Sequence, residues 1–422
     1  MRLESLSIRC FRGIDKLELV DIPSKCLVLV GVNGSGKSSV LEGLAIILDR
    51  YVRLVTYSSR KVRGFKLSDI PVSGSGRPEL HASFILAQDV RVGWSIRHKG
   101  MTTAVTGLIS EESESLNALT GAANNPEIDV PLVSYYPVNR GVIDVPLRIR
   151  QNTKKLSTEA FDGSLEGGSA DFRSFFAWFR QEEDAENEKR AQKDSSYRNS
   201  VLESVRNAIY RLLGTYDNLR IQRKPRLRMV ITKRVGERTD DLEINQLSDG
   251  EKCLLALAGD VARRLANSHP TLPDPTKGSG IVLIDEVELH LHPKWQRKII
   301  RSLRSAFPNI QFIVSTHSPQ VLAEVEGDSI RILEPESTGI KVSSPSGSYG
   351  RDVNQILLSV LDTDVRPDKT RDLLAEIGQS LARNELQMAG EKIQQFEKIV
   401  GADDLDVAAM KSAIRRREIL GR

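Results

Sequence analysis

The stretch "GVNGSGKSS" (Gly31–Ser39) fits the pattern G-x-x-x-x-G-K-[ST] at every fixed position. The apolar run Cys26–Val30 before it predicts a buried strand, and "KSSVLEGLAIILDR" after it has the periodicity of a helix. Strand, glycine loop and helix in this order are the context that a phosphate-binding loop requires. We therefore expect Gly31–Ser39 to bind the phosphates of a nucleotide.

The residues of this loop differ in their expected roles. Its glycines let backbone N–H groups close around the β-phosphate, where a side chain would obstruct them. Lys37 is predicted to reach the β- and γ-phosphates of ATP as a positive charge, and Ser38 to offer its hydroxyl to Mg²⁺. The loop residues expected to contact the nucleotide are Asn33, Gly34, Ser35, Gly36, Lys37, Ser38 and Ser39.

A second apolar strand, in "GIVLIDEVELHLHP", ends in the acids Asp285 and Glu286. Many buried strands end in Asp, but here a phosphate loop precedes the strand. Asp285 is therefore predicted to hold Mg²⁺. Glu286 is suited to orient or deprotonate the attacking water.

The next apolar strand ends in "STHSPQ" (Ser315–Gln320) and places His317 at the sheet edge where ligands bind in α/β folds. We predict that His317 forms a hydrogen bond to the γ-phosphate and so distinguishes ATP from ADP. The alternative is a histidine whose hydrogen bonds are satisfied within the core.

The phosphate loop, "LSDGE" (Leu247–Glu251), "VLIDE" and "STHSP" follow one another in this order, which resembles the ATPase core of the ABC superfamily. In that superfamily the serine–glycine motif serves the nucleotide of a facing subunit. The resemblance implies that Ser248 and the amides near Gly250 complete the site of a second copy. ATP would then hold a head-to-tail dimer together.

Further motifs narrow the resemblance. "IRCFRGID", with Phe11-Arg12-Gly13, and Asn33 in the phosphate loop resemble the SMC and RecF-like branch, where the arginine helps to hold nucleotide. "DEVELHLHPKWQ" and "FPNIQFIVSTHSPQVL" resemble bacterial AAA-like or OLD-like ATPases, including the ATPase subunits of Septu-type and retron-associated anti-phage systems. The resemblance covers about residues 1–60 and 207–330.

The expected fold is α/β. It is an ABC-type ATPase head with a mixed central sheet flanked by helices, an antiparallel β subdomain, a short helical insertion and a helical C-terminal region. Strands are predicted at "HASFIL", "VGWSIRH" and "TAVTGL", and one face of a late helix carries Leu373, Ile377 and Leu381. The predicted domains are an N-terminal ATPase lobe (1–146), the insertion (147–206), a C-terminal ATPase lobe (207–345) and the helical region (346–422).

The chain departs from the family pattern at three points. No glutamine loop is evident. The turn "YYPVNRG" could supply Asn139 or Arg140 in its place, or could be a simple strand-ending turn. The insertion is too short for the long coiled coil of SMC proteins, and the acid-rich nuclease (TOPRIM) domain of OLD proteins has no counterpart. Any nuclease activity would therefore come from a partner subunit.

Composition limits the partners. The formal net charge is +4 and the isoelectric point about 8.8, which permits contact with DNA or RNA without demanding it. Three scattered cysteines indicate a reducing compartment. The N-terminus lacks the apolar core of a signal peptide and no apolar run could span a membrane, so a cytoplasmic protein is expected.

Three other stretches carry alternatives. The basic stretch Leu219–Arg234 could meet a phosphate backbone or form a solvated strand face. His290 and His292 suggest a metal site only weakly, because no other ligands cluster with them. In the insertion, the aromatic residues around Trp178 are predicted to pack locally or to seat a partner, and the charged part that follows them is predicted to be solvated.

These observations predict a Mg²⁺-dependent ATPase that dimerises around ATP, with higher oligomers left open. The resemblance implies that it regulates a separate nuclease subunit of the HNH type in phage defence. The alternatives are a RecF/SMC-like DNA repair ATPase, and a scaffold that binds ATP with little turnover.

Overall fold

A computed structural model of the chain describes residues 1–57, 63–71, 76–86, 89–99, 102–108, 119–138, 157–166, 172–192, 194–337, 339–361, 363–364 and 366–420. The described residues form two compact units, Met1–Ile356 and Leu357–Arg422. The predicted domain boundaries at 146/147, 206/207 and 345/346 stay predictions.

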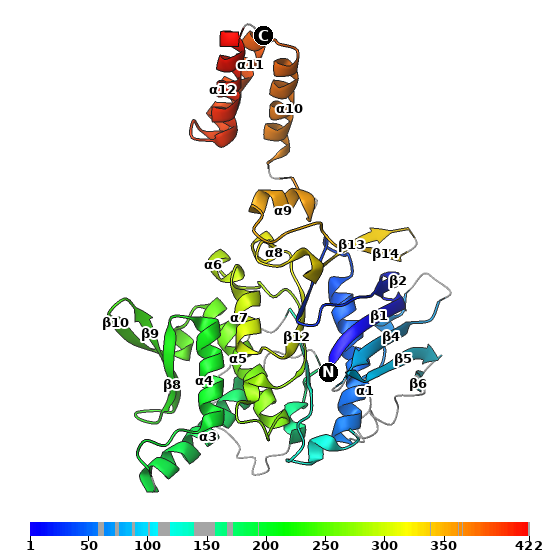
Figure 1. The fold of residues 1–422 in the computed structure, drawn as a ribbon, viewed down its shortest axis with the longest axis vertical. Helices are drawn as coiled ribbons and strands as arrows, with labels where there is room; N and C mark the ends of the chain where they lie inside the picture. Colours follow the sequence, from blue (N-terminus) through cyan, green and yellow to red (C-terminus); the bar gives the residue numbers. More distant parts are fainter. Residues whose placement is uncertain are drawn as a thin grey trace. The chain divides into compact units, whose positions relative to one another are not determined.

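A six-stranded mixed sheet lies at the centre of the first unit (Figure 1). All its neighbouring strands are parallel except the pair at one edge, where β14 is antiparallel to β13. Every residue of β3, β7, β11 and β12 is buried, as their largely apolar sequences predict. Across the sheet the strands are β14 (Gly339–Ser343), β13 (Ile330–Glu336), β3 (Cys26–Val30), β12 (Ile310–Ser315), β11 (Gly280–Ile284) and β7 (Leu132–Tyr136).

Helix α1 (Lys37–Thr56) follows the phosphate loop and lies between this sheet and a five-stranded antiparallel one. Trp94 is fully buried, stacks on Phe84 at 4.5 Å between ring centroids, and donates a hydrogen bond to the Ile47 carbonyl of α1. The antiparallel strands predicted from the sequence are confirmed. In order across the sheet they are β2 (Ile14–Leu19), β1 (Arg2–Phe11), β4 (Glu79–Ile85), β5 (Arg91–Lys99) and β6 (Thr102–Leu108).

A group of helices packs beside a three-stranded antiparallel sheet in the same unit. Gly259 of α5 permits a close approach of α3, because a Cβ atom at this position would lie 2.8 Å from the Phe175 ring. The segment Pro293–Phe307 forms two helices, because the Lys298 N–H bonds to the carbonyl three residues back and tightens the turn there. The elements are α3 (Phe172–Gln192), α4 (Ser200–Leu213), β8 (Tyr216–Gln222), β9 (Arg228–Val235), β10 (Arg238–Glu243), α5 (Asp249–Ser268) and α7 (Ile299–Ala306). The short helices α6 (Pro293–Gln296) and α8 (Pro319–Leu322) also belong to this unit, and α9 (Val353–Ser359) spans the boundary between the two units.

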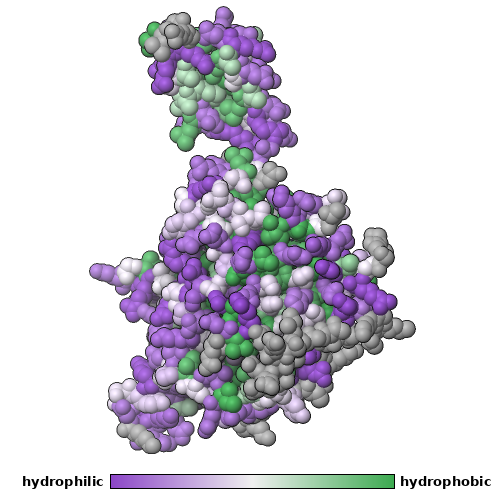
Figure 2. Space-filling view, turned by 45° about the vertical axis from the view of Figure 1, so that its right-hand side comes forward, coloured by the Kyte–Doolittle hydropathy of each residue, from purple (hydrophilic) through white to green (hydrophobic). Residues whose placement is uncertain are grey.

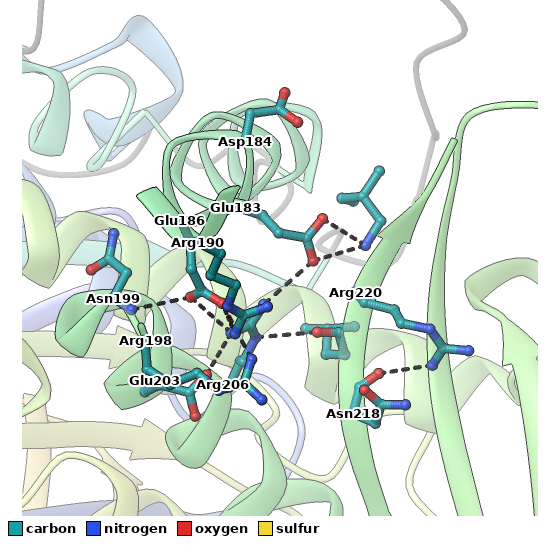
Figure 3. Close-up of polar contacts among 12 residues, drawn as sticks. Glu183, Asp184, Glu186, Arg190, Arg198, Asn199, Glu203, Arg206, Asn218 and Arg220 are labelled. Atoms are coloured by element: carbon teal, nitrogen blue, oxygen red, sulfur yellow. Dashed lines mark hydrogen bonds and ion pairs between the residues drawn. The ribbon is translucent and has the colours of Figure 1, made fainter. Parts of the chain in front are cut away.

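The prediction that the charged part of the insertion is solvated is wrong for three acids, Glu182, Glu183 and Glu186, whereas Asp184, Glu188 and Lys189 are exposed as predicted. Glu183 and Glu186 of α3 are buried, on the face that also carries the buried residues Phe175 and Phe179. Their partners come from distant parts of the chain. Glu183 accepts the Ile221 N–H of β8 at 3.1 Å, and Arg206 of α4 contacts both carboxylates (Figure 3). A charged helix face is buried here because another element brings the opposite charge.

Much of the basic stretch Leu219–Arg234 is paired within the chain. Arg220 forms an ion pair with Asp241, Arg226 with Glu243, and Arg234 with Asp217. Strand β10, which the sequence analysis did not anticipate, supplies Asp241 and Glu243. The alternative of a solvated strand face therefore describes this stretch only in part, because carboxylates of the same sheet form ion pairs with these arginines.

The second unit contains α10 (Asp368–Ala382), α11 (Leu386–Val400) and α12 (Leu405–Leu420). Ile377, Ile393, Phe396 and Val407 form its core, and Leu373 and Leu381 pack against it. The predicted apolar face of α10 is confirmed.

Hydrophilic residues predominate on the face of the molecule in Figure 2, with hydrophobic residues interspersed. Within the described ranges, no helix combines the length and apolar character needed to cross a bilayer.

The buried carboxylates of α3 make a testable contribution to stability. Replacing Glu186 by alanine removes a fully buried partner of Arg206, whose side chain is only 9% exposed. We expect the free energy of unfolding to fall by about 3 kcal/mol, because Arg190, Arg198 and Arg206 all lose a buried carboxylate, although Glu183 and Glu203 still pair with Arg206. Urea denaturation followed by tryptophan fluorescence measures the change. In the control Asp240→Ala, the exposed pair with Arg238 is lost, and we expect less than about 1 kcal/mol. Equal losses in both variants would contradict the assigned role of Glu186.

Candidate nucleotide site

The phosphate loop is held in a shape that only glycine permits at two positions. Gly31 has φ +154°, and a Cβ atom there would lie 2.5 Å from both the Leu333 carbonyl oxygen and the Ser35 Oγ. Gly36 has φ +96° and is the residue before α1, so the loop turns directly into the helix. The first backbone N–H groups of α1 therefore lie at the loop, as anion binding requires.

Lys37 lies within the loop. Its Nζ donates hydrogen bonds to the carbonyl oxygens of Gly31 and Val32 at 2.9 and 3.0 Å. Burial lowers the pKa of this lysine, while the nearby carboxylates of Asp285, Glu286 and Glu288 act in the opposite direction. The cation of Lys37 and the carboxylates of Asp285 and Glu286 thus come from different segments to one site.

Asp285 and Glu286 follow the last residue of β11, and Ser315 of the neighbouring strand links them. The Ser315 hydroxyl donates to Asp285 Oδ1 and accepts the backbone N–H of Glu286 at 2.8 Å. Glu286 has φ +46°, a left-handed conformation that is costly for a residue other than glycine. Such strain is typical of functional positions, where surrounding contacts fix the backbone.

His317 follows the end of β12, next to β11. Its backbone N–H donates to Glu288 Oε1 at 2.6 Å, and the Thr316 hydroxyl donates to Glu288 Oε2 at 2.7 Å. Burial lowers the pKa of His317, and the positive charge of Lys37 lowers it further, against the opposing effect of Glu288. Both effects favour the neutral imidazole, which has one donor and one acceptor nitrogen.

These residues surround one cavity of about 300 Å³. Three parallel strands, β3, β12 and β11, end at this cavity, so segments far apart in the sequence meet there. Of the predicted site residues, the cavity is lined by Asn33, Gly34, Gly36, Lys37, Ser38, Ser39, Asp285, Glu286 and His317, joined by Gly13 and Ile14.

Two other predicted residues are placed differently. Ser35 is fully buried beneath the loop, with its Oγ 3.4 Å from Lys37 Nζ. Arg12 does not line the cavity. Its Nε donates to Asp69 at 2.8 Å and its guanidinium lies over the Phe11 ring.

Ser248 and Gly250 do not line this cavity either. Ser248 is exposed and caps α5, where its hydroxyl and Glu251 bond reciprocally. Gly250 lies in the first turn, and a Cβ atom there would lie 2.6 Å from the His290 carbonyl oxygen. The predicted serine–glycine motif is thus an outward-facing helix start in contact with the segment that follows the acid pair.

Asn139 and Arg140 lie outside the described residues. Among the residues that the structure describes, no group of three His, Cys, Asp or Glu side chains could hold a metal, and His292 instead caps α6.

Ser315, Glu288 and the turn at Gly13 contribute to the site although the sequence did not predict them as site residues. Ser315 and Glu288 were visible as polar residues beside the predicted acids and histidine. Their hydrogen bonds could not be inferred, since these depend on the register between β11 and β12.

Two family models match the chain, and together they cover both regions of the predicted resemblance except its last few residues. A family model described as "AAA domain, putative AbiEii toxin, Type IV TA system" matches residues 108–323. Another, described as "AAA ATPase domain", matches residues 1–119.

Relatives confirm the predicted resemblance to retron-associated and Septu-type ATPases. "Retron Vc95 probable ATPase" of Vibrio cholerae serotype O1 biovar El Tor is 29% identical over 418 residues, covering 87% of this chain and 80% of that protein. "Retron Ec83 probable ATPase" of Escherichia coli is 28% identical over 495 residues, covering 99% and 87%. "Septu protein PtuA" of Bacillus mycoides (strain KBAB4) is 40% identical over 95 residues, covering 22% and 13%.

A solved structure of an SMC head bound to the C-winged helix domain of ScpA is 17% identical, with a TM-score of 0.49, and the match covers 82% of this chain and 98% of that one.

Glu288 is expected to matter through the position that it gives His317. Glu288→Ala removes both hydrogen bonds, and we expect ATP turnover to fall by roughly tenfold to a hundredfold because the histidine is misplaced. In Glu288→Gln, the amide oxygen can still accept from His317 N–H, so turnover is expected to stay near wild type. The lost negative charge should lower the pKa of His317, which ¹H–¹⁵N NMR titration measures.

Glu324→Ala serves as the control, since it removes a carboxylate paired with Arg301 outside the cavity. Wild-type turnover in Glu288→Ala would show that Glu288 does not position His317.

Proposed function

Because this chain belongs to the family described as "AAA domain, putative AbiEii toxin, Type IV TA system", we propose that it is a Mg²⁺-dependent ATPase whose copies close head to tail around ATP. The observation that carries the proposal is the convergence of Lys37, Asp285, Glu286 and His317 on one cavity, while Ser248 and Gly250 lie outside it. Such a site has the groups that bind ATP but lacks the motif that would complete it.

Each residue of the cavity has a role suited to phosphoryl transfer. The loop amides and Lys37 bind the β- and γ-phosphates, and the Ser38 hydroxyl and Asp285 carboxylate are oxygen donors of the kind Mg²⁺ prefers. When bound, Mg²⁺ would offset the negative charge of the phosphate groups. Glu286 accepts a proton from the attacking water or orients it, and His317 bonds to the γ-phosphate.

The head-to-tail arrangement follows from the position of α5. Its first turn carries the exposed Ser248, and the amides at the start of a helix favour an anion. A second copy that presents its γ-phosphate to this helix start would receive the donors that its own cavity lacks. Two such contacts, related by a twofold axis, form a closed dimer, and larger assemblies built from dimers are compatible with it.

The biological role that we propose comes from the relatives. Two are named retron probable ATPases and a third a Septu protein. We propose that this chain is the ATP-gated subunit of a cytoplasmic anti-phage complex, in which it regulates a separate nuclease of the HNH type.

Replacing Glu286 by glutamine tests the catalytic assignment. Glutamine keeps the size of the side chain but cannot accept the proton, so we expect ATP to bind while hydrolysis falls at least a hundredfold. The ATP-bound dimer should then accumulate, and mass photometry with and without ATP and Mg²⁺ would detect it. Unchanged hydrolysis would remove Glu286 from the catalytic role.

Subunit mixing tests whether Ser248 acts on the nucleotide of a partner. Lys37→Ala and Ser248→Arg should each be inactive alone. In a mixture, half of the dimers are mixed and each holds one intact composite site, so about a quarter of wild-type activity should return.

The matched control mixes Lys37→Ala with the double variant Lys37→Ala/Ser248→Arg, which offers no intact combination. Activity of Ser248→Arg alone, or no recovery in the first mixture, would count against a shared site.

A further inference from the structure

A second cavity, of about 380 Å³, lies between α3, α4 and β8, away from the nucleotide site. Five arginines line it: Arg190, Arg198, Arg206, Arg220 and Arg223. They come from four separate segments of the chain. Figure 3 shows Arg190, Arg198 and Arg206 grouped on the helical side and Arg220 on the strand across from them. We call this cavity the arginine pocket.

More basic than acidic residues line the arginine pocket, although further carboxylates behind the lining also form ion pairs with the arginines. Two lining residues, Glu183 and Glu203, are acidic. Other carboxylates reach the arginines from outside the lining: Glu186 pairs with Arg190, Arg198 and Arg206, and Asp241 with Arg220. The acids thus hold the arginines in place mainly from behind, and the cavity wall is basic.

The carboxylates also have backbone partners. Both oxygens of Glu183 accept the Ile221 N–H, and Glu186 accepts the Asn199 N–H at 3.2 Å. Each guanidinium, in contrast, has five N–H donors in a planar fork. Arg198 is 61% exposed and, among the described residues, its ion pair is with Glu186 at 3.4 Å. The pocket therefore has more donors than its acids engage.

The backbone of β8 is distorted at the pocket wall. The register of β8 against β9 shifts between Asp217 and Arg220, and Asn218 has φ +52°. After the shift the strand alternates again, with Leu219 and Ile221 buried and Arg220 half-buried, and the four residues 218–221 all contribute to the lining of the cavity. Bulges of this kind are common next to functional sites.

We propose that the arginine pocket binds phosphate groups. Guanidinium forks bind phosphate oxygens in bidentate fashion, and a wall with several forks from rigid elements suits this chemistry. The phosphates come from a polynucleotide backbone or from a free nucleotide. Part of the basic stretch Leu219–Arg234 belongs to this pocket, since Arg220 and Arg223 form one of its walls. The proposal does not depend on ATP hydrolysis.

The test uses the full chain with Lys37→Ala, so that the first site does not contribute. The first arm measures the affinity for a labelled single-stranded oligonucleotide of mixed sequence by fluorescence anisotropy. The second arm measures the affinities for inorganic pyrophosphate and for AMP by calorimetry. For whichever ligand binds, we expect Arg198→Ala to lower the binding affinity by about tenfold. For an oligonucleotide, the slope of log affinity against log salt should also fall by about one unit, whatever the sequence.

Two further variants make the result specific. Arg226→Ala removes an arginine of similar exposure, 67%, that pairs with Glu243 outside the pocket, and should change affinity less than twofold. Arg198→Lys keeps the charge but loses the fork, so it should weaken binding while the salt slope stays the same.

Oligonucleotide binding without pyrophosphate or AMP binding identifies a polynucleotide, and the reverse identifies a nucleotide. Two results overturn the proposal: no binding in either arm, and equal losses in Arg198→Ala and Arg226→Ala, which would reflect overall charge alone.

Discussion

The parallel pairing of β3, β12 and β11 is the constraint on which the candidate nucleotide site depends. Val314 lies opposite Ile284 in one pair and opposite Val28 in the other, so all three strands end at the same sheet edge. Residues from three distant segments therefore follow their strands into one cavity. A shift of one residue would turn each alternating side chain to the opposite face and separate the acids from Lys37.

Hydrogen bonds between the strand ends add a precision that strand pairing alone lacks. Ser315 bonds to both Asp285 and the Glu286 backbone, and Glu288 bonds to the two residues that follow Ser315. The two loops are thereby fixed to each other by hydrogen bonds within the chain. Such preorganisation matters in phosphoryl transfer, where positioning and charge supply most of the catalysis.

The sequence was sufficient to predict the phosphate loop, the acid pair, His317 and the strands that carry them, because these are local patterns. It was not sufficient for Glu183 and Glu186 of α3. A run of charged residues indicates solvent by composition, and these acids are buried because Arg206 and the Ile221 N–H reach them from other elements. Glu288 was missed for the same reason, since its role exists only across two strands.

Strand β8 connects the two sites that we propose. Near its start, Tyr216 donates a hydrogen bond to Glu251, the residue that completes the cap of Ser248 at the beginning of α5. Burial raises the pKa of Glu251, but the bonds from Tyr216 and Ser248 outweigh this and keep the carboxylate charged. Near its end, Arg220 lines the arginine pocket. The bulge at Asn218 lies between them, where the strand is least constrained by pairing with β9. The two proposed sites thus lie toward opposite ends of one strand, with the register shift between them.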